Sequence, residues 1–282
     1  VTDENGHITS CGDTVLGADD FAGVSAILEG VASLLESGAT HPTLELLFTT
    51  GEEHFCVGAK AFDAERLQSK TAYVMDLSGP VGDCAVAAPT LITFSAEVVG
   101  KAAHAGFAPE DGVHAIQVAA AAVANLPSGR WGDVTVNVGT ISGGRATNIV
   151  PDSCTVTGEI RALCHQDALD RLNEIHSEFV EQAQAVDAKL NFNHTIHITG
   201  YRVDTDAPVA QRFRRACAAV GVAPRFTDTY GGSDCNILSA HGIQGLVVAT
   251  AMNNCHAVNE YTTVEELCKA GRLAQALMEK QD

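Results

Sequence analysis

The sequence lacks two features that would point to a membrane or a nucleic acid. It has no apolar run of the roughly 20 residues that a membrane-spanning helix needs, and its longest candidate, AIQVAAAAVANL, is shorter and rich in alanine. It also has no basic excess, because 17 Lys and Arg residues stand against 35 Asp and Glu residues, for a formal net charge of −18. Nucleic acids and anionic membranes both require a basic footprint. We therefore expect neither as a partner.

The sequence also lacks the cysteine spacing of a small zinc domain and the start of an export signal. No two of its nine cysteines are separated by the two to four residues that are typical of a zinc knuckle. An odd number of scattered cysteines predicts reduced, mostly buried thiols and a cytoplasmic location. The polar first residues, VTDENGHITSCGDT, have neither a basic start nor an apolar core. Because they also lack an initiator Met, we expect the sequence to begin inside a longer reading frame.

The first and last parts of the chain alternate helical and strand patterns. An apolar stripe predicts a helix over 24–38, and continuous apolar runs predict short buried strands over 43–50 and 71–77. After Gly200 the alternation resumes, with helices over 208–221 and 264–280 and a strand over 245–250. Such alternation is typical of an α/β domain with a mainly parallel sheet.

The pattern between these parts is different. Strands are predicted over 90–100, 133–141, 153–163 and 189–198, with helices over 110–126 and 166–185. This β-α-β-β-α-β order is the ferredoxin-like α+β unit. We therefore expect one α/β domain over 1–88 and 200–282, interrupted by an inserted α+β domain over 89–199.

Carboxylates and a histidine follow several of the predicted strands or precede helices. They are Asp19, the pair Glu52 and Glu53, Asp76, and His256. Each alone has an ordinary explanation as a helix N-cap, a solvated strand end, a turn residue or a loop histidine. Because open α/β sheets bind ligands at the carboxyl ends of their strands, the set together predicts a site for a pair of divalent zinc, cobalt or manganese ions.

Seven ordered segments carry a resemblance to a known family. They are TVLGADDFAG, FTTGEEHFCVGAKAF, AYVMDLSGPVG, GKAAHAGFAPEDG, GGRATNIVPDSCTVTGEIR, YGGSDCNIL and NNCHAVNEYTTVEEL. Together they resemble the co-catalytic zinc exopeptidases of the peptidase T, carboxypeptidase G and acetylornithine deacetylase superfamily, most of all the tripeptidase T-like branch. The resemblance implies a zinc-exopeptidase catalytic domain with two divalent metal ions. It also implies that the inserted domain is a lid that forms a homodimer.

The resemblance assigns a role to each residue at the predicted site. Asp19 matches the aspartate that bridges two metal ions, and Glu52 matches the general acid/base. Glu53 and His256 match ligands of one metal ion, and Asp76 matches a ligand of the other.

A second set of residues matches positions that meet the substrate. His104 matches a lid histidine that reaches the partner subunit's active site and stabilises the oxyanion. Asn148 and Arg161 match lid positions at the polar end of the substrate. Ser233 and Asp234 complete the substrate-binding set.

The sequence departs from the family pattern at two places. The family has a His-x-Asp motif before the bridging aspartate, whereas His7 is followed by Ile and Thr. One metal site is therefore expected to be complete and the other to keep only two protein ligands, unless His7 or His54 replaces the lost histidine. The simplest explanation is an upstream segment that holds the motif and the first strands of the sheet. The second departure is Phe21 and Tyr230, where relatives have lysine and arginine, so that a strict preference for a free tripeptide carboxylate is not expected.

Three functions remain open from the sequence. The first is a metal-dependent, tripeptidase-like aminopeptidase that cleaves small peptides with a metal-bound hydroxide and Glu52 as the base. The second is an N-acyl amino acid deacylase that uses the same site. The third is an inactive dimerisation or metal-binding module.

Overall fold

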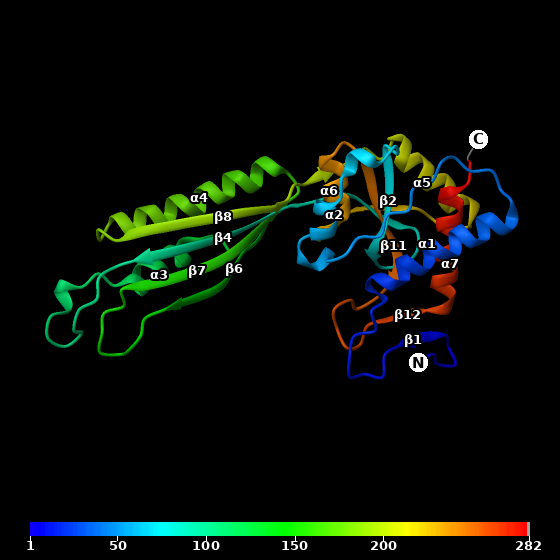
Figure 1. The fold of residues 1–282 in the computed structure, drawn as a ribbon. Helices are drawn as coiled ribbons and strands as arrows, with labels where there is room; N and C mark the ends of the chain where they lie inside the picture. Colours follow the sequence, from blue (N-terminus) through cyan, green and yellow to red (C-terminus); the bar gives the residue numbers. More distant parts are fainter. Residues whose placement is uncertain (281–282) are drawn as a thin grey trace. The chain divides into compact units, whose positions relative to one another are not determined.

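The computed structural model describes residues 1–280, which divide into two compact units. The split unit consists of Val1–Ala88 together with the chain from Arg202 onward, and the inserted unit consists of Pro89–Tyr201. Both units contain helices and a sheet (Figure 1). The short strand β9 (Tyr201–Arg202) lies at their boundary.

The inserted unit is an antiparallel sheet with helices on one face. Its strand order is β5-β6-β7-β4-β8, and helices α3 and α4 cover the face that holds the apolar core (Figure 1). The predicted β-α-β-β-α-β order is confirmed, and β5 is an additional short strand. The elements are β4 (Thr90–Val99), η3 (Pro109–Asp111), α3 (Ala115–Asn125), β5 (Gly129–Trp131), β6 (Val134–Gly143), β7 (Ser153–Ala162), α4 (His165–Gln184) and β8 (Lys189–Ile198).

Alternation along the strands decides which face of this sheet is buried. On β4, Phe94 and Val98 are buried against the helices, whereas Ser95 and Glu97 on the other face are half-exposed. Phe179 of α4 lies fully buried in the same cluster. This period of two is the pattern of a sheet with one covered face and one open face.

The split unit has a mixed sheet with the order β10-β3-β11-β2. β10 is parallel to β3 and β11 is parallel to β2, whereas β11 and β3 are antiparallel. β1 and β12 form a separate antiparallel pair. The elements are β1 (His7–Thr9), α1 (Ala18–Ser37), η1 (Glu52–His54), α2 (Val57–Ala61), η2 (Ala64–Arg66), β2 (Thr71–Ser78), β3 (Asp83–Ala88), α5 (Pro208–Ala219), β10 (Arg225–Asp228), α6 (Asp234–Ala240), β11 (Gln244–Met252), β12 (Tyr261–Thr263) and α7 (Val264–Met278).

Two glycines of α1 allow the helix to approach its neighbours closely. A Cβ atom at Gly30 would lie 2.9 Å from the backbone nitrogen of Gln275 in α7, and the two helices run side by side (Figure 1). A Cβ atom at Gly23 would lie 2.0 Å from the carbonyl oxygen of Met75 in β2. The start of α1 is therefore held against the carboxyl end of β2.

The strand predicted over 43–50 is wrong. This segment has no strand hydrogen bonds, and its side chains Leu46 and Phe48 are 47% and 49% exposed. Within residues 1–280 no strand lies beside it, and the outer edge of β2 is also unpaired. A cavity of about 760 Å³ separates the segment from β2 and is lined by both. An apolar run forms a strand only where a neighbour accepts its backbone hydrogen bonds.

None of the helices in residues 1–280 combines the length and the apolar character that crossing a bilayer requires.

Candidate active site

Three side chains from distant parts of the split unit meet at one point. The Nε2 atom of His256 lies 2.9 Å from Oδ2 of Asp19 and 2.8 Å from Oε1 of Glu53. Their ligand atoms all lie within 4.8 Å of one another. The structure therefore brings together the three residues that the sequence predicts for one complete metal site.

Asp19 is placed by an irregular start of α1. Gly17 precedes it with a φ of 79°, and the backbone of Asp19 and Asp20 is non-helical, with a cis peptide bond between the two. The backbone N–H of Asp19 donates to Oε1 of Glu260 at 2.9 Å, and that of Gly17 donates to Oε2 at 2.7 Å. The side chain of Asp19 is thus presented from a turn rather than from a regular helix.

Glu52 and Glu53 lie in the short helix η1, which follows the extended segment. The backbone around them is unusual, since Gly51, Phe55 and Cys56 all have positive φ values of 58° to 67°. For Phe55 and Cys56 this left-handed conformation is strained. Strain of this kind is concentrated at functional sites, where the surrounding structure maintains it.

His256 lies on a loop that is closed at its base. Asn253 and Tyr261 exchange two backbone hydrogen bonds at 3.0 and 3.1 Å, so that the intervening residues form a compact loop. His256 itself has a φ of 65°, and its side chain is 62% exposed. Asp19, through its hydrogen bond, and then Glu53, through its charge, raise the pKa of the imidazole.

Further carboxylates crowd the wall of the neighbouring cavity. Asp20, Glu52, Asp76 and Asp234 all line it. Burial is the main reason why the pKa of Asp76 is raised to about 9, followed by the charges of Asp20, Asp19 and Glu52. Burial and neighbouring carboxylates also raise the pKa values of Asp20 and Glu52 to about 7 each. So many carboxylates around one imidazole call for compensating positive charge.

Ser233 and Asp234 begin helix α6. Ser233 is buried, and its Oγ accepts the backbone N–H of Cys235 as the N-cap of the helix. The hydroxyl of Thr49 donates to Oδ2 of Asp234, whereas Oδ1 is buried and accepts no hydrogen bond from an N–H or O–H group in the described part of the chain. Asp234 thus lines the cavity wall with a carboxylate that also interacts with the Cys56 thiol, and Ser233 fixes the start of its helix.

The inserted unit brings two of the predicted lid residues together. His104 and Ile149 form a β-bridge, and the backbone N–H of Ala105 donates to the carbonyl oxygen of Asn148 at 3.0 Å. His104 is exposed, and its ring packs on Phe107 with the centroids 4.3 Å apart. His104 and Asn148 thus share one exposed end of the inserted unit.

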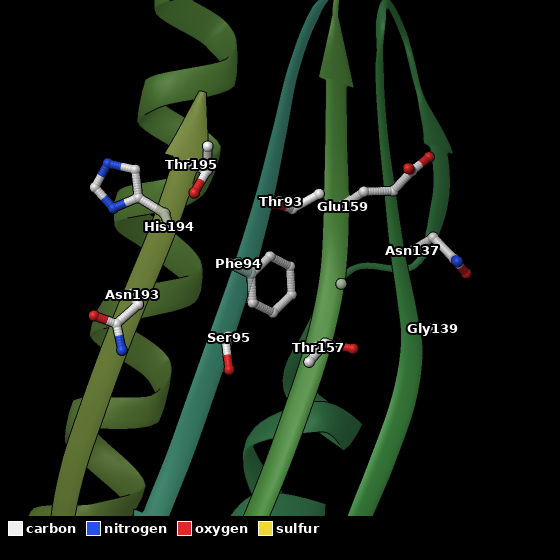
Figure 2. A pocket seen from close by; sticks show the side chains of 11 residues that line it. Thr93, Phe94, Ser95, Asn137, Gly139, Thr157, Glu159, Asn193, His194 and Thr195 are labelled. Atoms are coloured by element: carbon white, nitrogen blue, oxygen red, sulfur yellow. The ribbon is translucent and has the colours of Figure 1, made fainter. Parts of the chain in front are cut away.

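Arg161 lies at the other end of the same sheet. It pairs with Leu91 at the start of β4, whereas His104 follows the end of that strand. Its guanidinium is held by Glu159 at 2.9 Å. Glu159 in turn lines a hollow of about 400 Å³ on the open face of the sheet, together with Asn137, Asn193 and several threonines (Figure 2). Within one chain, Arg161 is therefore not a neighbour of His104 and Asn148.

Sequence reasoning missed Glu260 and gave Asp20 no role. Glu260 is only 1% exposed, and its two oxygens accept the backbone N–H groups that hold the Asp19 turn. No local pattern marks Glu260, because its partners Gly17 and Asp19 lie 243 and 241 positions away in the sequence. Asp20 accepts the backbone N–H of Gly23 at 3.0 Å and faces the cavity.

The two histidines considered as replacements lie outside the cluster. Within residues 1–280, the group of potential ligands consists of Asp19, Glu53 and His256. His7 lies on β1, with its ring 5.7 Å from that of Tyr261 and its Nδ1 3.6 Å from Asp3. His54 follows Glu53 in η1 without joining the group.

Comparisons with known proteins relate the chain to peptidases. A family model described as the peptidase dimerisation domain matches residues 86–187, and one described as peptidase family M28 matches residues 4–89. Protein YqjE of Bacillus subtilis is 34% identical over 278 residues, which cover 98% of this chain and 75% of the relative. Peptidase T of Escherichia fergusonii is 26% identical over 283 residues, which cover 96% of this chain and 67% of that protein.

Two solved structures share the fold over nearly the whole chain. The aminopeptidase PepT from Bacillus cereus has a TM-score of 0.93 and 37% identity, over 98% of this chain and 74% of its own. A tripeptidase from Staphylococcus aureus has a TM-score of 0.95 and 29% identity, over 99% and 74%. The chain therefore belongs to the M20 peptidase superfamily, in its peptidase T-like branch.

Proposed function

We propose that this protein is a metal-dependent exopeptidase that removes the amino-terminal residue of small peptides, as a tripeptidase-like aminopeptidase does. The observation that carries the proposal is the meeting of Asp19, Glu53 and His256 beside a cavity that Glu52 lines. The likeness to an aminopeptidase and to a tripeptidase supports it.

The residues present fit a divalent metal ion. One imidazole nitrogen and two carboxylate oxygens form a donor set that zinc accepts, and atoms bound to one zinc ion at about 2.0–2.2 Å lie within about 4.4 Å of one another. Nε2 of His256 lies 2.9 and 2.8 Å from the carboxylate oxygens of Asp19 and Glu53, which is within this limit. We propose Asp19, Glu53 and His256 as the ligands of one ion, with Asp19 and Asp76 as the ligands of a second. Zinc is the first candidate, and cobalt and manganese are alternatives.

Glu52 has the placement of a general base. The chemistry supplied at this site by bound divalent ions is Lewis acidity, which polarises the scissile carbonyl group and makes water more acidic. Glu52 lies next to Glu53 in sequence, lines the cavity and stays outside the ligand cluster. Its carboxylate can therefore accept the proton of the attacking water and pass it to the leaving amine.

Asp234 supports cleavage at the amino terminus of the substrate. Its carboxylate lines the same cavity as Glu52, and a carboxylate at that wall is a suitable acceptor for a peptide ammonium group. An N-acyl amino acid has no such ammonium group. This favours the aminopeptidase over the deacylase.

We also propose that the protein is a homodimer formed through the inserted unit. β5 pairs with β6 only over Val134–Val136, so that the outer edge from Asn137 to Gly143 has no partner within residues 1–280. Unpaired edges of this kind are templates for pairing with another chain. The match to the peptidase dimerisation domain supports this role for the unit. In the dimer, His104 of one protomer would stabilise the oxyanion in the other, with Asn148 beside it and Arg161 binding the polar end of the substrate.

Sedimentation tests the dimer. Ile141, half-exposed on the free edge, is changed in I141K, and Val186, similarly exposed in the same unit but after α4, is changed in V186K as the control. We expect I141K to sediment as a monomer and V186K as a dimer. A wild-type monomer, or equal behaviour of both variants, would refute this interface.

Substrate profiling tests the function itself. Purified protein is supplied with zinc, cobalt or manganese and offered a tripeptide, a dipeptide and an N-acetyl amino acid. We expect cleavage of the tripeptide with release of its first residue. Faster cleavage of the N-acetyl amino acid would assign the deacylase function, and inertness toward all three would assign the inactive module.

The nine free thiols support a reducing, cytoplasmic location for this activity.

A further inference from the structure

Glu260 connects the two turns that hold the candidate metal ligands. Its backbone belongs to the His256 loop, where its N–H donates to the carbonyl oxygen of Ala257 at 2.9 Å. Its side chain crosses to the turn before α1, where it accepts the N–H groups of Gly17 and Asp19. One residue thus fixes the separation of two ligands that lie 237 positions apart in the sequence.

Burying the carboxylate of Glu260 costs free energy, which the contacts around it offset only in part. The side chain is 1% exposed, and within residues 1–280 no Lys or Arg forms an ion pair with it, although its charge helps to raise the pKa of His256. A buried carboxylate without a paired Lys or Arg is unfavourable. Two backbone hydrogen bonds offset part of this cost. The remainder suggests that the group serves the neighbouring site rather than stability.

An ordinary helix cap does not explain the arrangement. Gly17 is the N-cap of α1 and has no side chain, and its φ of 79° disfavours the Ser or Asp that would cap an ordinary helix. Glu260 instead holds two successive donors, on either side of Ala18. This fixes the path of the turn as well as its hydrogen bonding.

We propose that Glu260 is a positioning residue for metal binding, which sets the backbone of Asp19 relative to His256 so that both reach one ion. The inference rests on the proposed function, because it concerns the same site. Partners behind metal ligands typically contribute about 10-fold to 100-fold in metal affinity. Glu260 would act one bond further back, through the ligand's backbone rather than its side chain.

The test is a cobalt titration of the full chain and of two variants. Calorimetry measures the affinity, and the visible spectrum reports the coordination of the bound ion. E260Q keeps the size of the side chain but places an NH₂ donor against one of the two N–H groups. T262V is the matched control, because Thr262 lies two residues further along in β12, is 3% exposed, and its Oγ1 has no partner in the described chain. Melting temperatures without metal are measured for all three proteins.

We expect E260Q to bind cobalt about 10-fold to 100-fold more weakly with an altered spectrum, and T262V to bind it as the wild type does. If E260Q does not fold, E260D, which keeps the charge but is one methylene shorter, is expected to show the same loss. A lower melting temperature with unchanged cobalt affinity would reduce Glu260 to a structural cap and overturn the inference. Absence of cobalt binding by the wild type would overturn the proposed metal site and this inference together. Cobalt binding without peptidase activity would contradict only the proposed reaction.

Discussion

The two units of the chain differ in how completely they satisfy their own backbone and charges. In the inserted unit, β4 and β7 are paired on both sides, the outer edges of β8 and of most of β6 are free within residues 1–280, and two helices cover the apolar face. In the split unit, the outer edge of β2 is free, the segment 43–50 is extended but unpaired, and acidic side chains crowd one cavity. Regular strands and a covered apolar face thus mark the inserted unit, whereas irregular backbone and crowded carboxylates mark the unit in which we propose the metal site.

Substitution of Glu52 is expected to have the largest effect. We expect E52Q to lower kcat by about 10²-fold to 10⁴-fold, because the amide cannot accept a proton. Metal content should remain that of the wild type, since Glu52 lies outside the ligand cluster. E36Q, on the exposed face of α1, serves as the control and should keep full activity. An active E52Q enzyme would remove the base from the mechanism.

Substitution of one phenylalanine in each unit compares the packing of the two units directly. Phe179 is fully buried in the inserted unit, whereas Phe48 is 49% exposed in the unpaired segment. We expect F179A to lower the free energy of unfolding by about 3–5 kcal/mol and F48A to change it by no more than about 0.5 kcal/mol, both measured by urea unfolding. A large effect of F48A would mean that the segment is covered in solution, which would erase the contrast.

Removal of divalent ions should lower the local stability of the split unit only. A ligand present at 100 times its dissociation constant stabilises the folded state by about 2.7 kcal/mol. After treatment with a chelator, we therefore expect faster hydrogen exchange in α1 and β11 and unchanged exchange in α4, whose residues lie in the inserted unit. Equal changes in both units, or none, would contradict a metal site confined to the split unit.

Asp234 tests the smaller question of which substrate end is bound. D234N should lower kcat/KM for a tripeptide by about 10-fold to 100-fold, because a hydrogen bond to a charged group contributes about 1.5–3 kcal/mol. The same change should have little effect on any residual cleavage of an N-acetyl amino acid. N236A, which removes the Asn236 side chain from the capping box that it forms with Ser233, controls for damage to the start of α6. An equal loss with both substrates would assign Asp234 a structural role.

The sequence predicts most of the inserted unit because its signals are local. Alternating residues such as Phe94 and Ser95 determine both the strand and its buried face, and the helical period does the same for α4. The predicted strand over 43–50 fails for the opposite reason, since strand formation there depends on a neighbour that its own residues do not specify. The short elements β5, β10 and α6 are missed because they contain too few residues to show a clear hydrophobic period.

The residues of the candidate site also divide into those that the sequence predicts and those that depend on contacts between distant segments. Asp19, Glu53 and His256 were predicted because each belongs to a segment that resembles the family, and the structure places them together. The contribution of Glu260 could not be predicted, because it depends on a contact between two loops at opposite ends of the chain. The proximity of Asp20 to Asp76 likewise follows from the close approach of α1 and β2 at Gly23.

Anomalous diffraction from crystals grown with zinc tests the central claim most directly. Data collected on either side of the zinc absorption edge locate the ion without any assumption about activity. The account predicts an anomalous peak within about 2.0–2.2 Å of Asp19, Glu53 and His256. A protein that contains zinc only at other residues, or a peak bound by the cysteines, would contradict it.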